Sequence, residues 1–446
     1  MSAASRPNVL LITTDQQAAL AVGAAGNPDL ATPAMDALGE RGVRFERAYC
    51  PFPLCTPSRA SLYTGRMPHE VGADYNNKPI GREFRSGELG NLMAAAGYDC
   101  AYGGKWHVPE IAIGEGHGFT RICGFDDWAL ADRSIDFLRT PRSAPFFLVA
   151  SFDNPHNICE HSRRQRLPWG PVPQVPVGEC PNLPANFEIP AYEPSLIKQE
   201  RALKPASELT EDEWRVYRHT YYRLVEKVDA GVARIMAALE EAGHGHDTLV
   251  IFTSDHGDGM GAHRWNQKWV LYDESTRIPL IVRPPAGCPA RVDDEHLVSN
   301  GLDLLPTICD YAGVQPPPGL RGRSLRPLTD GGAGAGGAGW RDHVVAETCF
   351  GPDAGAAQQA RMVRTARYKY CLYGSGRNRE QFFDLERDPG EMVNLAVEAR
   401  HAGELGRHRA LLKDWIEETG DRACMTGPHQ GYQALVPGYE NEPPEV

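Results

Sequence analysis

The chain has 446 residues, of which 41% are hydrophobic and 23% are charged, so it can bury a large core and is unlike a disordered or fibrous protein. Its 58 acidic and 46 basic residues give a net charge of -12, which argues against general binding to nucleic acid. Any anionic ligand must therefore be met by a local cluster of positive side chains.

The N-terminal segment and the cysteines bear on the compartment. The apolar run that starts near residue 8 is far shorter than the roughly 20 residues of a membrane span, and it lacks the form of a signal peptide. Eleven cysteines without a CxxC pair are not typical of a disulfide framework. We therefore expect a cytoplasmic protein with free cysteines and no association with a membrane.

Apolar runs alternate with helical patterns along the chain, which indicates an α/β fold with a mostly parallel central sheet and helices on both faces. The expected strands are almost continuously apolar, as in strands buried on both sides, and cover residues 8–13, 99–102, 145–151, 248–254 and 279–282. Helices are expected over residues 87–96, 210–242 and 303–312. The longest begins at a capping box formed by Thr210 and Glu213.

Two segments of unusual composition mark the organisation of the chain. The Pro-rich residues 168–194 lack periodicity and are expected to run irregularly over the surface, where they could wall a cleft. The glycine-rich residues 331–339 are expected to be a flexible connection. Strand patterns in residues 361–374 and 380–388 and an amphipathic helix near 404–418 follow. We therefore predict one domain over residues 1–339 and a smaller C-terminal α+β domain over 340–446.

Polar side chains follow two of the predicted strands, where ligands of open α/β sheets bind. Asp15 and Gln16 end the first strand, and Asp255 and His256 end a later one. Their oxygen atoms and imidazole can converge on a divalent cation. Each pair taken alone fits a helix cap or a turn equally well, so both interpretations stay open at this point.

Other polar residues are weaker candidates when taken singly. Lys105 and His107 alternate along an extended segment, and His156 follows a predicted strand. A single histidine in such a place is more often a structural hydrogen-bonding group. Lys268, taken alone, fits a solvated surface charge.

One short run holds several unlike residues at fixed spacing: Cys55, Pro57, Ser58 and Arg59, followed by Thr64-Gly65-Arg66. This run resembles the signature of type I sulfatases, which belong to the alkaline phosphatase superfamily. A buried cysteine beside a helix cap is the structural alternative, and it does not account for the spacing. The resemblance extends from residue 8 to the run at 382–396, so it implies the alkaline phosphatase fold for nearly the whole chain and a catalytic role for residues 1–339.

The resemblance also implies a set of cofactors and site residues. In this family the signature cysteine is oxidised to Cα-formylglycine by a separate formylglycine-generating enzyme, which would be a partner of this protein. The implied metal ligands are Asp15, Gln16, Cys55, Asp255 and His256. The implied catalytic residues are Cys55, Arg59, Lys105, His107, His156 and Lys268.

The implied reaction is the hydrolysis of a small-molecule sulfate ester to an alcohol and sulfate. The metal, Arg59, Lys105 and Lys268 would offset the charge of the ester, and a metal-bound hydroxyl of the hydrated aldehyde would attack sulfur. His156 or Lys268 would protonate the leaving alcohol. His107 would deprotonate the second hydroxyl, so that sulfate is expelled. A sulfated mono- or oligosaccharide is the first expectation for the substrate.

The sequence departs from the commonest sulfatase pattern. Gln16 replaces an Asp, His256 stands where Asn is frequent, and Asn157 alters the motif after His156. Calcium remains the expected metal, with manganese, magnesium and zinc as alternatives. The sequence leaves open whether the chain forms a homo-oligomer.

The same departures favour an alternative function. Gln16 and His256, with Asn76 and Asn77 as candidate substrate-binding residues, also resemble phosphonate monoester and phosphodiester hydrolases of the superfamily. The pair Lys105 and His107 favours a sulfatase. A third hypothesis, a catalytically silent binding protein, conflicts with the intact set of site residues.

Overall fold

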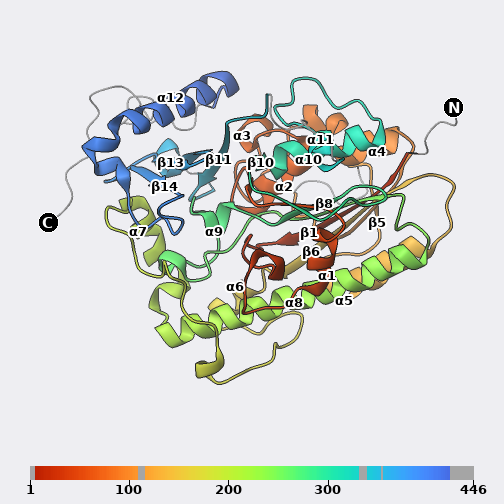
Figure 1. Ribbon diagram of the computed structural model, residues 1–446, viewed down its shortest axis with the longest axis horizontal. Helices are drawn as coiled ribbons and strands as arrows, with labels where there is room; N and C mark the ends of the chain where they lie inside the picture. Colours follow the sequence, from red (N-terminus) through yellow and green to blue (C-terminus); the bar gives the residue numbers. More distant parts are fainter. Residues whose placement is uncertain (1–5, 109–115, 331–338, 353–354, 422–446) are drawn as a thin grey trace.

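The computed structural model describes residues 6–108, 116–330, 339–352 and 355–421, and an eight-stranded sheet lies at its centre (Figure 1). The strand order is β5-β4-β6-β1-β7-β8-β2-β9. Strands β5, β4, β6, β1 and β7 are parallel neighbours, whereas β8 runs antiparallel to both β7 and β2. The predicted mostly parallel sheet is therefore confirmed. Its strands are β1 (Asn8–Asp15), β2 (Val43–Phe45), β4 (Asp99–Gly104), β5 (Thr120–Arg121), β6 (Phe146–Pro155), β7 (Thr248–Ser254), β8 (Leu280–Arg283) and β9 (Arg291–Asp293).

Helices cover both faces of this sheet, as predicted (Figure 1). Successive side chains of a strand point to opposite faces. Leu10 and Ile12 of β1 accordingly pack in the core under α1 (Pro33–Gly39), α5 (Asp127–Arg139) and α8 (Glu211–Glu241). Val9 and Leu11 pack in the core on the other face, under α2 (Cys55–Thr64), α4 (Leu89–Ala95) and α10 (Asn300–Ala312). Burial on both faces explains the uninterrupted apolar run of residues 9–12 in β1.

A four-stranded antiparallel sheet forms the C-terminal region, with the order β11-β12-β13-β14. Its strands are β11 (His343–Cys349), β12 (Gln359–Thr365), β13 (Tyr368–Tyr373) and β14 (Glu380–Asp384), and α12 (Ala402–Thr419) packs on one face. This agrees with the predicted small α+β region. On the other face Met362 and Phe383 pack against Leu271 and Tyr272, so this sheet also adjoins the residues that follow β7.

The domain boundary near residue 340 stays a prediction. Residues 331–338 of the expected linker, and residues 353–354 and 422–446 of the expected C-terminal domain, lie outside the described residues. The Pro-rich residues 168–194 contain only a 3₁₀ turn, Val177–Glu179, as regular structure, in agreement with the predicted irregular course.

Short α-helices and strands complete the elements of these two kinds in the part of the chain that the structure describes. They are α3 (Pro68–Val71), α6 (Ile158–Ser162), α7 (Ser195–Ala202), α9 (Asp273–Thr276), α11 (Arg326–Thr329), β3 (Ala48–Tyr49) and β10 (Val298–Ser299). None of the helices within the described ranges combines the length and the apolar character that crossing a bilayer requires.

Candidate active site

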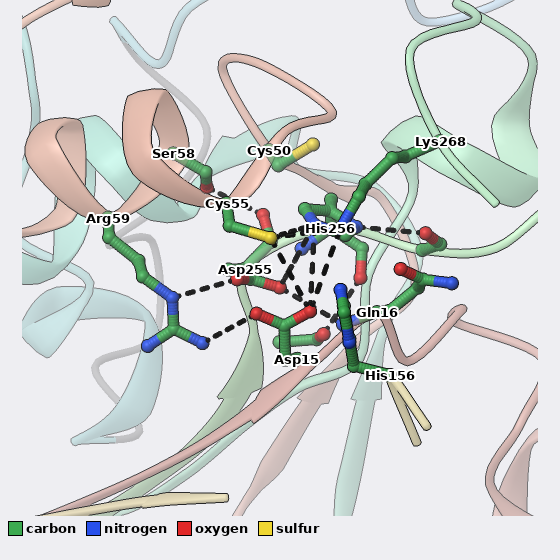
Figure 2. Close-up of polar contacts among 12 residues, drawn as sticks. Asp15, Gln16, Cys50, Cys55, Ser58, Arg59, His156, Asp255, His256 and Lys268 are labelled. Atoms are coloured by element: carbon green, nitrogen blue, oxygen red, sulfur yellow. Dashed lines mark hydrogen bonds and ion pairs between the residues drawn. The ribbon is translucent and has the colours of Figure 1, made fainter. Parts of the chain in front are cut away.

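The carboxyl ends of four neighbouring parallel strands bring the predicted site residues to one edge of the sheet. β1 ends at Asp15, β4 ends just before Lys105, β6 ends just before His156, and β7 ends just before Asp255. The N-terminus of α2, with Cys55, lies at the same edge (Figure 2). The topology of the sheet therefore assembles residues that are far apart in the sequence.

Cys55 is the first residue of α2, and its thiol is buried among polar groups. Its Sγ lies 2.9 Å from Nζ of Lys268, 3.4 Å from Nε2 of His256 and 3.6 Å from Oδ1 of Asp15. Burial and the charge of Asp15 act to raise the pKa of this thiol. The positive charges of Lys268, Lys105 and His256 act in the opposite direction and outweigh both, so the pKa lies well below its usual range.

Cys50, also drawn in Figure 2, shows how local that effect is. It is just as buried as Cys55, and its Sγ donates to the carbonyl of Ser275. Burial and the charge of Asp255 raise the pKa of the Cys50 thiol. Only position 55 of these two therefore favours a negative charge.

Arg59 lies one helical turn after Cys55 and on the same side of α2. Its Nε donates to Oδ2 of Asp255 at 2.9 Å, and its Nη2 donates to Oδ2 of Asp15 at 3.1 Å. Its Nη1 donates to the carbonyl of Lys105 at 2.9 Å. Arg59 therefore fixes the two carboxylates in place. Direct contact between Arg59 and a substrate stays a prediction.

Four of the five predicted metal ligands form one buried cluster. Asp15, Cys55, Asp255 and His256 offer ligand atoms that all lie within 4.8 Å of one another. Nδ1 of His256 lies 3.0 Å from the carbonyl of Gly257 and donates to it, which leaves Nε2 facing the cluster.

The carboxylates of this cluster are adapted to a cation. Burial and the negative charge of Asp15 raise the pKa of Asp255 to about 7. Burial also works against a charge on Asp15, but the cations around it, Lys105 first, hold the pKa of Asp15 well below its usual range. Two buried carboxylates with one imidazole are a donor set that suits a divalent cation, and the residues therefore fit the metal that the family implies.

Gln16, the fifth predicted ligand, has other partners for its side chain. Its Nε2 donates to Oδ2 of Asp258 at 2.7 Å, and its Oε1 lies 3.6 Å from Sγ of Cys159. Its backbone N–H donates to Oδ1 of Asp255 at 3.0 Å, from a residue with φ of 73°. Ligation of the metal by Gln16 stays a prediction. Asp258 was missed by the sequence analysis, although it stands three residues after Asp255.

Lys105 is enclosed by two carboxylates. Its Nζ lies 2.9 Å from Oδ2 of Asp15 and 3.0 Å from Oδ1 of Asp153, a residue that the sequence analysis also missed. Nδ1 of His156 lies 3.9 Å from the same Asp153 oxygen. Burial and the charges of Lys105 and Lys268 lower the pKa of His156, so its imidazole is neutral at neutral pH.

The remaining predicted residues lie around the first turn of α2, which has no N-cap side chain of its own. Oδ1 of Asn76 accepts a hydrogen bond from the backbone N–H of Thr56 at 3.0 Å, and Asn76 thereby caps the N-terminus of α2. The carbonyl of His107 accepts a hydrogen bond from Oγ1 of Thr56 at 2.7 Å. Nδ1 of His107 is buried without a hydrogen-bond partner among the described residues. Asn77 has φ of 66° and shapes the turn beside Asn76. The catalytic and substrate-binding roles of these residues stay predictions.

Comparison with known proteins agrees with this geometry. The family model "Sulfatase" matches residues 7–314, and the model "N-sulphoglucosamine sulphohydrolase, C-terminal" matches residues 261–415. The Delta 4,5-hexuronate-2-O-sulfatase of Bacteroides thetaiotaomicron is 33% identical, over 98% of this chain and 95% of the relative. An arylsulfatase of Clostridium perfringens is 28% identical, over 97% of this chain and 98% of the relative.

Solved structures are similar over the same extent. A 2-O GAG sulfatase has a TM-score of 0.84 at 29% identity, covering 99% of this chain and 98% of the other. The phosphonate monoester hydrolase of Agrobacterium radiobacter has a TM-score of 0.75 at 25% identity, covering 94% and 97%. The resemblance inferred from the run that begins at Cys55 is confirmed: the chain belongs to the sulfatase family.

Proposed function

We propose that the protein hydrolyses the sulfate ester of a carbohydrate. The reaction would use a formylglycine, made from Cys55, and a divalent metal ion, for which calcium is the first candidate. The observation that carries this proposal is the setting of Cys55 at the start of α2, where its Sγ faces Lys268, His256 and Asp15. Asp15, Asp255 and His256 would hold the metal. When bound, the two groups supply a nucleophilic oxygen at position 55 and a positive charge that acidifies it and offsets the charge of the ester.

Two lysines of the site carry the charge that the substrate requires. Burial acts to lower the pKa values of Lys105 and Lys268. The negative charges of Asp15 and Cys55 outweigh this effect, so both pKa values lie above the usual value of a lysine. Both ammonium groups are therefore protonated at neutral pH. They can hold a sulfate ester in a protein of net negative charge and can stabilise the charge that develops on its oxygen atoms.

The two candidates for proton transfer to the leaving alcohol differ in their protonation. Lys268 carries a proton at neutral pH, whereas the lowered pKa of His156 leaves its imidazole neutral in the free protein. An anionic substrate beside His156 would raise that pKa. We therefore propose Lys268 as the donor that is ready in the free protein, and His156 as a donor that needs the bound substrate.

A carbohydrate as the leaving group has support from two sides. Relatives are named Delta 4,5-hexuronate-2-O-sulfatase and N-acetylglucosamine-6-O-sulfatase. In this chain Phe125 is 53% exposed, while its ring centre lies 5.3 Å from the buried Nζ of Lys105. The ring is thus an apolar surface beside the sulfate-binding charges, against which the face of a sugar can pack.

Phosphonate monoester hydrolysis is the second candidate function. The likeness to the solved phosphonate monoester hydrolase and the presence of Gln16 at the end of β1 favour it. In this structure, however, Oδ1 of Asn76 is occupied by the backbone of Thr56. The combination of Lys105 and His107 favours the sulfatase.

The test begins with protein co-expressed with a formylglycine-generating enzyme. Mass spectrometry of the peptide that contains Cys55 shows whether the thiol has become an aldehyde. The same preparation is then assayed with sugar sulfates, an aryl sulfate and an aryl phosphonate, with Cys55→Ala as the control. Aldehyde together with faster sulfate release supports the proposal. Faster phosphonate hydrolysis supports the second candidate, and an unmodified thiol with full activity overturns both mechanisms.

A further inference from the structure

Lys204, two residues after the end of α7, is a partly buried lysine without a counter-charge in contact. Its Nζ lies 3.6 Å from the ring centre of Trp269 and 5.6 Å from that of Trp265. In the described part of the chain, no side chain forms an ion pair or a hydrogen bond with this ammonium. Glu200 acts on it electrostatically, but the two form no ion pair.

Trp269 connects this lysine to the catalytic centre. Trp269 directly follows Lys268, whose Nζ lies 2.9 Å from Sγ of Cys55. The backbone N–H of Trp269 donates to the carbonyl of Pro53 at 3.1 Å, so the tryptophan is held beside the segment that leads into α2. Lys204 therefore lies on the ring of the residue that follows Lys268, and it is close enough for the charge of Lys268 to act on it.

The electrostatics of Lys204 agree with this position. Burial, Glu200 and Lys268 together set its pKa at about 8: burial and the charge of Lys268 lower the pKa, and the charge of Glu200 works in the opposite direction. A partly buried ammonium near a second cation is unfavourable as long as no anion is close. Other basic residues of the same segment are not in this situation, because Arg201 forms a buried ion pair with Glu193 and Lys198 is exposed.

We propose that Lys204, supported by the ring of Trp269, binds a second anionic group of the substrate, either a carboxylate or a further sulfate on the sulfated sugar. The enzyme would then select acidic sulfated sugars. This inference rests on the proposed function, because it assigns the leaving group of that reaction. The face of the indole ring keeps the ammonium in place, and the anion supplies the counter-charge that the protein itself does not.

Binding without turnover tests the proposal directly. Metal-loaded Cys55→Ala protein is titrated with three ligands sulfated at the same hydroxyl: glucuronic acid, glucose, and glucose with a second sulfate. The first ligand differs from the second only in its carboxylate. We expect the acidic ligand that Lys204 recognises to bind more tightly than glucose sulfate. In the Lys204→Met variant the ratio of the two affinities should fall about tenfold, which corresponds to the loss of one charge-assisted hydrogen bond. The Lys204→Arg variant should retain most of it.

Two comparisons complete the experiment. Lys198→Met removes an exposed charge from α7 and should keep the wild-type preference. In formylglycine-containing enzyme, the ratio of kcat/KM for the acidic sugar sulfate to that for the neutral one should fall with Lys204→Met and not with Lys198→Met. Equal preferences in Lys204→Met and wild type would overturn the inference. Absence of sulfate release from every ester would overturn the proposed function instead, and the titration would still decide the role of Lys204.

Discussion

Nζ of Lys268 lies 2.9 Å from Sγ of Cys55, although one residue follows β7 and the other begins α2. The same Nζ is 3.9 Å from Oδ1 of Asp15, and the lysine is buried. The negative charges of Cys55 and Asp15 outweigh burial and raise the pKa of Lys268. A permanent positive charge is therefore placed beside the reacting position.

Replacing this lysine should impair catalysis without preventing maturation. Lys268→Met keeps most of the side-chain volume and removes the charge. We expect kcat for an aryl sulfate to fall by about 10²–10³, as when a donor that stabilises developing charge is removed. Steady-state kinetics, normalised to the formylglycine content measured by mass spectrometry, checks this. Lys198→Met, which changes an exposed lysine, is the control, and a Lys268→Met enzyme with wild-type kcat would contradict the assigned role.

Removal of the metal should reduce both activity and stability. In the metal-free cluster, burial first and the negative charge of Asp15 second raise the pKa of Asp255, so a charge on both carboxylates is unfavourable there. A ligand that binds only the folded state stabilises it by about 2.7 kcal/mol at a hundredfold excess over its Kd. We therefore expect EDTA to abolish sulfate release and to lower the Tm by a few degrees, and calcium to restore both.

The stability readout needs a variant that cannot bind the ion. Asp15→Asn should show the same Tm with EDTA and with calcium. Wild-type protein whose Tm is insensitive to EDTA and calcium would argue against a metal at this cluster.

The fold could be predicted where one local pattern decides the structure. The uninterrupted apolar runs of β1 and β7 show burial on both faces, and the capping box of Thr210 and Glu213 marks the start of α8, as found. Strands β2 and β9 have three residues each, and the pairing of β2 with β8 and with β9 is decided by distant parts of the chain. The start of α5 was overlooked, although Asp126 caps it through the N–H groups of Trp128 and Ala129.

The site residues, too, could be predicted from the sequence only in part. The signature around Cys55 and the polar strand ends were enough to name the residues that the structure brings together. Asp153 and Asp258 were not named, because a buried carboxylate is found only when its partner is known, Lys105 in one case and Gln16 in the other. Lys204 was missed for a related reason, since its lack of a partner is visible only in three dimensions.

The ion pair of His69 and Glu347 gives a pH-dependent contribution to stability. It joins α3 to β11, and although burial opposes the charge, the charge of Glu347 raises the pKa of His69 to about 9. Because the folded pKa lies above the unfolded value of 6.5, the contribution is complete below pH 6.5 and is lost as the pH rises through 9. It amounts to about 3 kcal/mol at most.

Urea unfolding of wild type and His69→Gln between pH 6 and pH 10 measures this contribution. The difference in unfolding free energy should be largest near pH 6 and should shrink toward pH 10. Glu347→Gln should remove most of the pH dependence as well. A difference that is constant over this range would show that His69 does not titrate as described.

The contact between Gln16 and Asp258 predicts the effect of placing an acid at position 16. In Gln16→Glu a carboxylate replaces the amide that lies 2.7 Å from Oδ2 of the buried Asp258. Two facing carboxylates without a cation between them should lower the unfolding free energy by about 3–5 kcal/mol. Asp258→Asn in the same chain restores one donor and one acceptor, and the double variant should therefore be more stable than Gln16→Glu alone.

A double-mutant cycle measured by urea unfolding separates this contact from a metal-ligand role. If Gln16 acts mainly through Asp258, the interaction energy is large and the calcium-dependent rise in Tm is the same in the double variant as in wild type. A Gln16→Glu protein that is as stable as wild type in EDTA and gains more stability from calcium would show instead that residue 16 faces the metal. The cycle thus decides between the partner seen in the structure and the ligand role that the sequence suggested.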